Sequence, residues 1–444
     1  MFKLKHFISK FYYNYISQEG RYFKWDVLNK SQFNSRLKIE EFQSKKLEDI
    51  LKYAVHNVPA YSHMKYDNSK SPQQNLLEFP ITDKGYYRSK EKSALSLEKD
   101  ELNYYKSSTS GSTGESFFFL LDMERHAWAM AAKYRTDAFC NIFPNDSRAS
   151  LWGASFDNKN KKSFKKRVNS YLTPFTFMSS YNMSEEQLFN YVELIKKRKP
   201  KLLISYSTPL VELASFCKNQ DVKFPFLKAI ISSSEQLHDF QKEIVEDAFG
   251  VKVYNRYGTR EFGSIAQECS EHDGLHINSE RVFIEILNDE NKPCDIEEKG
   301  QLVITDLDNK VMPLIRYKVG DFAAWSGTDL CQCGRGLPKL AYIEGRSFDV
   351  IKTPNGTKIS GTFWTLLTRH VSEDIKTFQI IQNKIESVDL NLVMLKNKTL
   401  SENQLSELHH GITKVDSKLQ VRINFVEKID LTKSGKQRFI VSRI

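Results

Sequence analysis

The feature that most constrains the fold is an alternation of helix-like and strand-like patterns through the middle of the chain. Residues 124–143 and 184–199 repeat apolar side chains at helical spacing, whereas the short apolar runs at 201–207, 228–234 and 251–258 are typical of buried strands. Helices and strands that alternate in this way bury their apolar faces in one layered core. The pattern therefore predicts an α/β fold in which helices cover a sheet.

A change in the pattern of strand-like and glycine-bearing segments near residue 345 predicts a second folding unit. Strand-like segments dominate after about residue 280, and the polar stretch 344–360 carries glycine. The last hundred residues follow the order strand, strand, helix, strand, at 375–382, 387–395, 401–417 and 419–429. With 444 residues the chain is about three times as long as an ordinary domain. We therefore predict a large N-terminal α/β domain, 1–345, and a small C-terminal α+β domain, 346–444.

Composition and hydropathy exclude several classes of protein. The chain is 40% hydrophobic and 12% aromatic, which argues against intrinsic disorder. It has no apolar run of about 18 residues, and Lys, His, Ser and Asn interrupt its first segment, so we expect a cytoplasmic protein without a transmembrane or signal segment. This basic, aromatic first segment could lie on a membrane surface, although a packed N-terminal helix is the simpler interpretation.

The net charge of +10 leaves nucleic acid, anionic lipid or phosphorylated substrates as candidate partners. The excess is concentrated in 159–167 and 196–201, which are interpreted either as solvated faces or as docking surfaces for an acidic partner. Neither run is interleaved with aromatic residues, and no helix-turn-helix or zinc-finger spacing is present. A protein that only binds nucleic acid or other polyanions is therefore disfavoured.

Two loops carry residues suited to phosphate chemistry. The segment KSSTSGSTGE (106–115) combines hydroxyl groups with two glycines, so its backbone N–H groups can approach phosphate oxygens, but it lacks the lysine of a Walker loop. The segment NRYGTRE (255–261) follows a strand-like run. There Tyr257 could stack on a base, Thr259 could reach a phosphate, and Glu261 could hold Mg²⁺.

Three further positions become candidate site residues only when they are considered together with these loops. Asp321 follows a glycine at an expected strand end, where a carboxylate can accept from both hydroxyls of a ribose. Arg346 lies at the expected domain boundary, and Lys436 lies on a glycine-bearing loop near the end of the chain. Each of them taken alone is equally consistent with an ordinary turn.

The cysteines are too few for a disulfide framework and fit a metal site better. Cys331 and Cys333 lie in one tight turn, and Cys269 with His272 or His276 would complete the four ligands of a tetrahedral Zn²⁺ site. His276 is preferred because it begins a strand-like run that would hold it rigidly. The alternative is a pair of unrelated loops that carry reduced thiols.

In this order the segments resemble the ANL superfamily of adenylate-forming enzymes, and more closely its phenylacetate-CoA ligase and CapK-like (capsular polysaccharide biosynthesis) branch. The resemblance spans essentially the whole chain and includes LKYAVHNVPAYS, FPITDK, TSGSTGES, NRYGTREFGSIAQEC, MPLIRYKVGD, CQCGRGLP, EGRSFD and SGKQRFIVS. In this branch similar CxCGR segments imply a structural metal site beside the active site.

The resemblance implies a role for each candidate position. The β- and γ-phosphates of ATP would be held by Thr109, Ser110, Gly111, Ser112, Thr113 and Gly114. Adenine would lie between Tyr257, with its neighbour Gly258, and the strand end formed by Ser234 and Glu235. Mg²⁺ would be held by Glu261 and the ribose by Asp321. Arg346 would approach the ribose and phosphates, and Lys436 would reach in from the small domain.

The resemblance also implies a substrate pocket and shows two departures. Segments that include Trp152 and Tyr206 would line the acyl pocket, although both side chains could be core aromatics. Glu115 stands where relatives often carry lysine, and Phe348 stands where they carry an acid, so Asp349 is expected to serve as the hinge acid.

The implied activity is adenylation of a carboxylic acid by ATP with Mg²⁺, followed by acyl transfer. The acceptor would be CoA, the phosphopantetheine thiol of an acyl carrier protein, or an amine, and the pathway would be surface-polysaccharide biosynthesis. The basic run 159–167 would suit an acidic carrier or the phosphates of CoA. The alternative is adenylyl transfer to an acceptor hydroxyl, as in relatives that act on a deazaflavin coenzyme.

Overall fold

We describe a computed structural model of the chain that covers residues 2–16, 20–109, 117–152, 171–180, 183–327, 329–344, 351–359, 364, 367–368, 371–372, 374–430 and 437–444. The chain forms two compact units, Met1–Glu344 and Gly345–Ile444. Each unit has its own hydrophobic core. No helix in the described ranges is long and apolar enough to cross a membrane.

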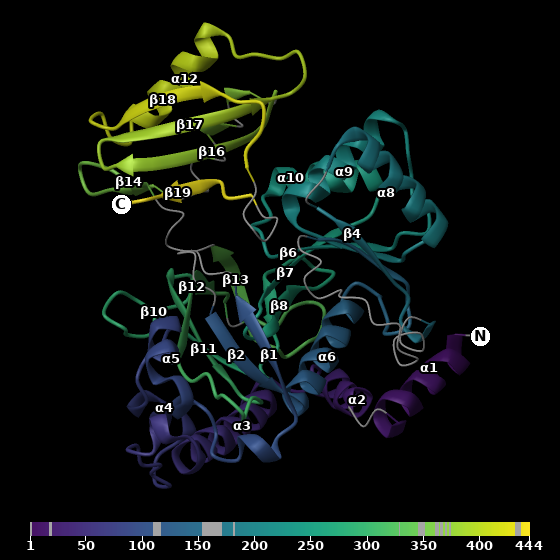
Figure 1. The fold of residues 1–444 in the computed structure, drawn as a ribbon, viewed down its shortest axis with the longest axis vertical. Coiled ribbons are helices and arrows are strands. Elements are labelled where there is room, and N and C mark those ends of the chain that lie inside the picture. Colours follow the sequence, from purple (N-terminus) through teal and green to yellow (C-terminus); the bar gives the residue numbers. More distant parts are fainter. Residues whose placement is uncertain are drawn as a thin grey trace. The chain divides into compact units, whose positions relative to one another are not determined.

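The first unit is built on a mixed sheet of eleven strands in the order β10-β11-β12-β13-β9-β8-β7-β6-β5-β3-β4 (Figure 1). Its parallel half consists of β3 (Arg148–Trp152), β4 (Phe175–Ser179), β5 (Leu202–Ser205), β6 (Ala229–Ser233) and β7 (Val253–Thr259). Its antiparallel half consists of β8 (Gly263–Glu268), β9 (Leu275–Ile277), β10 (Val282–Leu287), β11 (Gly300–Asp306), β12 (Tyr317–Trp325) and β13 (Lys339–Glu344). The predicted α/β fold is confirmed.

Amphipathic helices cover the sheet as the alternation of patterns requires. The parallel half packs on α8 (Glu185–Arg198), α9 (Ser207–Asn219) and α10 (Asp239–Phe249), whose apolar faces share one core with its strands. The apolar positions of α8 recur as Leu188, Val192 and Ile195, all buried. Ser184 caps this helix by accepting from the Gln187 N–H.

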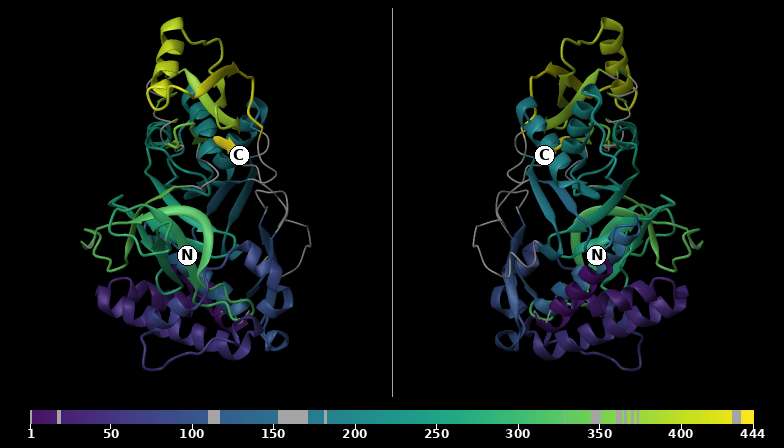
Figure 2. Two further views of the ribbon diagram at one scale, coloured as in Figure 1. Left: turned by 90° about the vertical axis from the view of Figure 1, so that its left-hand side faces the viewer. Right: turned by 90° about the vertical axis from the view of Figure 1, so that its right-hand side faces the viewer.

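The N-terminal helices are α1 (Phe2–Phe11), α2 (Arg21–Ser31), α3 (Arg36–Asn57), α4 (Pro72–Glu78) and α5 (Lys84–Lys90). Helices α3 to α5 share cores with the antiparallel half and lie in the purple and blue layer at the lower end of both views in Figure 2, whereas α2 packs on α6 (Met123–Ala138) and α1 contacts Asn145 before β3. The hairpin β1 (Tyr104–Thr109) and β2 (Phe117–Asp122) leads into α6, which packs against α2 and β8. This packing places the ends of β1 and β7 in one region of the unit.

The second unit is the small α+β fold that the sequence pattern predicts. Its four-stranded sheet has the order β18-β17-β16-β19, with β16 (Ile375–Lys384), β17 (Ser387–Met394), β18 (Gln420–Phe425) and β19 (Ile440–Ser442). Helix α12 (Glu402–Thr413) buries Leu408 and Ile412 in the core of this unit. A short hairpin, β14 (Ile351–Lys352) and β15 (Lys358–Ile359), completes the described elements.

Candidate functional site

Tyr257 and Asp321 meet in the first unit although 64 residues separate them. The Tyr257 hydroxyl donates a hydrogen bond of 2.6 Å to Oδ2 of Asp321. The sequence placed Asp321 at a strand end, which is wrong in detail, because Asp321 lies within β12 and both edges of β12 are paired. The strand-like run 251–258 corresponds to β7, which continues to Thr259 because it pairs with β8. An aromatic ring and a carboxylate therefore lie side by side on rigid strands.

Glu261 lies in the tight turn between β7 and β8. Its side chain is 5% exposed and accepts a hydrogen bond of 3.3 Å from the Tyr317 hydroxyl, while Lys84 Nζ lies 4.0 Å from the same oxygen. Thr259 closes the turn, since its hydroxyl accepts from the Phe262 N–H at 3.2 Å. A Cβ on Gly258 would lie 2.5 Å from the Gly263 carbonyl oxygen, so only glycine fits there.

Two buried arginines hold the backbone of this turn. Arg125 on α6 donates to the carbonyl oxygen of Glu261 and, at 3.1 Å, to Asp306 Oδ2. Arg281 donates to the carbonyl oxygen of Phe262 at 3.1 Å and to Asp308 at 3.1 Å. Charge-assisted hydrogen bonds to buried carbonyls are strong and geometrically specific. The position of the Glu261 carboxylate is therefore set by the core as well as by the turn.

Thr109 is the last residue of β1 and lies near the same turn. Its hydroxyl is buried and finds no hydrogen-bond partner among the described residues. Arg260 donates to the Ser108 carbonyl at 3.2 Å, which ties the end of β1 to the turn that carries Glu261. The start of the hydroxyl-rich loop and the acidic turn are therefore neighbours, and an unsatisfied buried hydroxyl between them suits a bound oxygen-rich group.

Ser234 and Glu235 follow β6, the neighbour of β7. The register pairs Ser233 with Arg256, so residue 234 lies at the same edge of the sheet as Tyr257. Ser234 has a φ of +68°, which a non-glycine residue rarely adopts. Glu235 accepts from the Ser207 hydroxyl at 3.1 Å and from the Thr208 N–H at 3.0 Å. Its carboxylate thus anchors the first turn of α9 to this strand end.

Trp152 is the last residue of β3, and Tyr206 directly follows β5. Their ring centroids lie 4.2 Å apart with an interplanar angle of 42°. Tyr206 is buried, whereas Trp152 is half-buried beside a core cluster. The two rings therefore form one aromatic wall at the carboxyl edge of the sheet, and their role in an acyl pocket stays a prediction.

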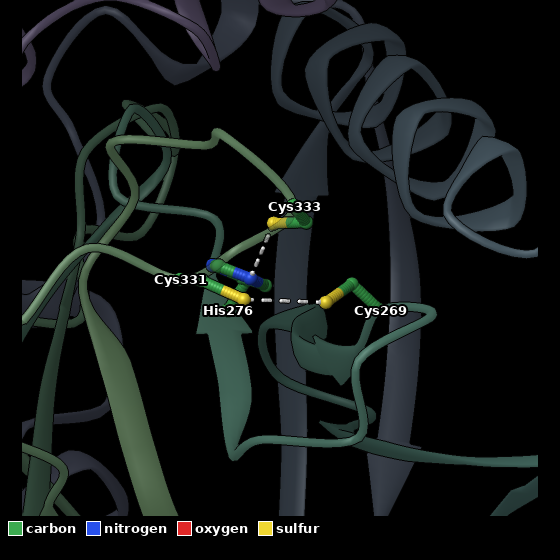
Figure 3. A group of neighbouring side chains, drawn as sticks. All are labelled: Cys269, His276, Cys331 and Cys333. Atoms are coloured by element: carbon green, nitrogen blue, oxygen red, sulfur yellow. Dashed lines mark hydrogen bonds between the residues drawn. The ribbon is translucent and has the colours of Figure 1, made fainter.

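The structure brings together Cys269, His276, Cys331 and Cys333 (Figure 3). Their four ligand atoms all lie within 4.8 Å of one another. Sγ of Cys269 lies 3.6 Å from that of Cys331, and Sγ of Cys333 lies 3.3 Å from Nε2 of His276. Because His276 on β9 pairs with Lys339 on β13, the sheet itself joins the two halves of this cluster.

His272 does not belong to this cluster. Its ring faces Glu268 at 2.9 Å and Lys242 at 3.1 Å, at a turn where its φ is +52°. Burial lowers the pKa of His276 to about 4, so the imidazole is neutral at pH 7, as a metal ligand must be. The structure thus favours His276 over His272 as the fourth ligand.

The three thiols differ in acidity. Burial raises the pKa of Cys269 to about 12 and raises that of Cys331. For Cys333 burial is outweighed by hydrogen bonds from the Arg335 backbone and side chain, which lower the pKa. A divalent cation would supply the positive charge that ionises the two less acidic thiols. This donor set of three sulfurs and one imidazole fits a tetrahedral metal ion.

Several predicted positions lie outside the described residues. They are Ser110, Gly111, Ser112, Thr113, Gly114, Glu115, the basic run 159–167, Arg346, Phe348, Asp349 and Lys436. Their implied roles stay predictions.

Sequence reasoning missed four residues that contact the acidic turn. Lys84 and Tyr317 belong to FPITDK and MPLIRYKVGD, two motifs that carry the resemblance, so a signal for them existed. Nothing in the sequence indicated that Arg125 and Arg281 contact this turn. An arginine in an amphipathic helix or beside a strand is normally interpreted as a solvent-exposed side chain. Only the tertiary structure shows that both are buried against this turn.

Comparison with known proteins agrees with this geometry. Residues 351–443 match the model of the CapK C-terminal domain. Protein CapK of Staphylococcus aureus is 25% identical over 415 residues, covering 91% of this chain and 89% of that protein. The phenylacetate-coenzyme A ligase of Escherichia coli is 23% identical over 331 residues, covering 70% of this chain and 72% of that enzyme.

A solved structure shares the fold. It is 2-hydroxyisobutyryl-CoA ligase in the postadenylation state, with a TM-score of 0.71 at 18% identity, and the match covers 90% of this chain and 88% of that one. Sequence similarity over nearly the whole chain, the match of the C-terminal domain and the common fold agree. The chain is therefore similar, over nearly its whole length, to the phenylacetate-CoA ligase and CapK-like branch of the ANL superfamily of adenylate-forming enzymes, as its motifs indicated.

Proposed function

We propose that this protein activates a carboxylic acid with Mg·ATP and transfers the acyl group from the resulting adenylate to the thiol of CoA or a carrier protein, or to an amine. The observation that supports this most is the meeting of Tyr257, Asp321, Glu261 and Thr109 in one region of the first unit. A role in surface-polysaccharide biosynthesis is also part of this proposal, and it rests on the resemblance of the motifs to the CapK-like branch.

Each of these side chains suits one part of ATP. The Tyr257 ring offers a face to the adenine, and Asp321 accepts hydrogen bonds from the ribose hydroxyls. Thr109 begins the loop that would face the β- and γ-phosphates. Mg²⁺ bound at Glu261 would supply positive charge against those phosphates, and a buried carboxylate held by a tight turn is a suitable hard ligand for it.

The chemistry needs few protein groups. A carboxylate oxygen of the substrate attacks the α-phosphorus in line, the bond from that phosphorus to the bridging oxygen breaks, and pyrophosphate leaves. Lys436 would neutralise the negative charge that develops in this transition state. The mixed anhydride formed is sensitive to water, so we expect the small unit to shield it during acyl transfer.

The metal cluster has a structural role in this proposal. We propose that Cys269, His276, Cys331 and Cys333 bind one Zn²⁺, because thiolate and imidazole ligands suit zinc, and four protein ligands leave no open coordination position. The ion would join the residue-269 loop to the residue-331 loop next to the strands β9 and β13.

Release of pyrophosphate from Mg·ATP by the purified protein, across a panel of aryl, short aliphatic and amino acids, tests the proposed activity. We expect release that depends on one class of acid and is lost in Lys436→Ala, because a charge that acts only in the transition state is worth several orders of magnitude in rate. When CoA or an amine is added as acceptor, it takes the acyl group from the adenylate, so free AMP should accumulate with the acyl product. Pyrophosphate release without free AMP, with AMP found on an acceptor hydroxyl, would contradict the proposal in favour of adenylyl transfer.

Arg125→Lys should raise the Mg²⁺ concentration needed for half-maximal pyrophosphate release and lower the maximal rate about tenfold. Lysine keeps the charge but cannot reach both Asp306 and the Glu261 carbonyl, and an unsatisfied buried carbonyl costs roughly 1–3 kcal/mol, which lets the turn shift. Arg135→Lys is the matched control, since Arg135 is fully buried on the same helix but donates to Glu280 and Asn278.

The Arg135 variant should lose a similar amount of thermal stability without any change in its Mg²⁺ requirement. Equal Mg²⁺ profiles for both variants would show that Arg125 only stabilises the fold.

A further inference from the structure

The first helix has its polar side toward the protein and its apolar side toward solvent. His6 lies 3.3 Å from the Asn145 side chain, Ser9 accepts a hydrogen bond from the same amide, and Lys10 pairs with Asp26. Surface helices normally bury their apolar stripe. This reversed arrangement means that packing on the body of the protein does not account for the apolar residues of α1.

These apolar residues form one continuous surface with part of α2, which we name the N-terminal apolar face. Phe7 is 66% exposed and Phe11 is 51% exposed. The rings of Phe11 and Tyr15 lie 5.5 Å apart, and those of Tyr15 and Phe23 lie 5.6 Å apart, so the surface continues from α1 to α2. Its exposed members are Leu4, Phe7, Ile8, Phe11, Tyr15, Ile16, Phe23 and Val27. A contiguous apolar surface of this kind marks a binding site.

The charge around this face selects the partner. Several cations of this region are already engaged within the protein, since Lys10 pairs with Asp26, Lys24 pairs with Glu124, and Arg21 is buried over the ring of Tyr13. The first acidic residue is Glu19, and three lysines precede it. Aromatic and aliphatic residues on one side of a helix, with lysines and no acids in the same segment, are the pattern of helices that lie in the interface of anionic membranes.

We propose that the N-terminal apolar face binds a membrane surface that contains anionic lipids. Helix α1 lies along the outer edge of the first unit, so it can lie parallel to a bilayer without unfolding (Figure 1). Its rings would enter the headgroup region, and the charge that would attract anionic lipid is that of Lys3 and Lys5. A second copy of the chain fits less well, because pairing would bring together two first segments that contain three lysines and no acidic residue before Glu19. Binding of this kind is the membrane-surface alternative for the first segment, and it does not depend on the proposed enzymatic function.

Sedimentation of the full-length protein with vesicles tests this proposal. We expect binding to vesicles of phosphatidylcholine mixed with phosphatidylglycerol, weaker binding to phosphatidylcholine alone, and release as salt rises. The double substitution Phe7→Ser with Phe11→Ser should weaken binding at least about a hundredfold, because each exposed ring contributes about tenfold or more when it leaves water. Lys3→Gln with Lys5→Gln should weaken binding to the anionic vesicles about tenfold.

Phe189→Ser is the matched control, since Phe189 on α8 is 58% exposed but lies in a different element. It should bind vesicles as the unsubstituted protein does, and all variants should keep the same melting temperature without lipid. Failure of the unsubstituted protein to bind anionic vesicles would overturn the proposal. So would equal loss of binding in the Phe189 variant, or a dimer in solution that Phe7→Ser with Phe11→Ser converts to a monomer.

Discussion

Glu261→Gln is expected to lower the kcat/KM for acid-dependent pyrophosphate release by about a hundredfold or more. Glutamine keeps the size of the side chain and its contact with Tyr317, but it removes the negative charge that we propose as the Mg²⁺ ligand. Loss of one electrostatic contact that stabilises the transition state typically costs about 10²–10³ in rate. The rate should be measured over a range of Mg²⁺ concentrations, because partial recovery at high Mg²⁺ identifies a metal ligand.

Glu285→Gln provides the control for this substitution. Glu285 lies on β10 of the same sheet and forms two hydrogen bonds with Arg316, of 3.1 and 2.8 Å. Its loss should lower the melting temperature through the broken ion pair and leave the Mg²⁺ requirement unchanged. A Glu261 variant with the unsubstituted protein's rate and Mg²⁺ profile would remove Glu261 from the proposed site.

Loss of the metal cluster is expected to cost the most stability. A ligand that binds only the folded state stabilises it by about 4 kcal/mol when its free concentration is a thousand times its Kd. We therefore expect Cys269→Ser or Cys331→Ser to lose the bound zinc and to lower the melting temperature by roughly 5 °C or more. Zinc content by elemental analysis and the melting curve measure the two effects. Chelator added to the unsubstituted protein should lower the melting temperature by the same amount. This measurement tests the prediction even if a cysteine variant does not fold.

Cys217→Ser is the matched control for the metal prediction. Cys217 is also a fully buried thiol, but it lies on α9 in the core of the parallel half of the sheet. It should lower the melting temperature without changing the zinc content. If the purified protein contains no zinc and chelator leaves its melting curve unchanged, the cluster is a group of reduced thiols beside a histidine.

The metal cluster also shows how far the spacing of residues along the chain can predict a metal site. The sequence named Cys269, Cys331 and Cys333 as ligands and preferred His276 without excluding His272, because the two histidines follow Cys269 at three and seven residues and either could reach the same metal ion. The pairing of β9 with β13 selects His276, and the turn at residue 272 directs the other ring toward Glu268. Strand pairing between distant segments is a property of the sheet, so local spacing could not decide it.

The proposed nucleotide site could be predicted in its parts and not in its arrangement. Motifs singled out Tyr257, Glu261 and Asp321 as candidates because segments at strand ends carry recognisable turn and charge patterns. They did not show that Tyr257 and Asp321 share a hydrogen bond, or that Arg125 holds the turn from α6. Contacts of this kind join residues more than 60 positions apart, which no local pattern encodes.

The sequence by itself determined the classes of element and the order of the two units, because apolar periodicity reports which side of each segment must be buried. What only the tertiary structure decided is which side of α1 faces the protein. The simpler interpretation of the first segment was a packed N-terminal helix, whose apolar side would ordinarily face inward. Polar contacts of His6, Ser9 and Lys10 with Asn145 and Asp26 instead turn that stripe outward. The choice between the two sides depends on the partners that the fold presents, and one of them, Asn145, lies 139 residues beyond His6 along the chain.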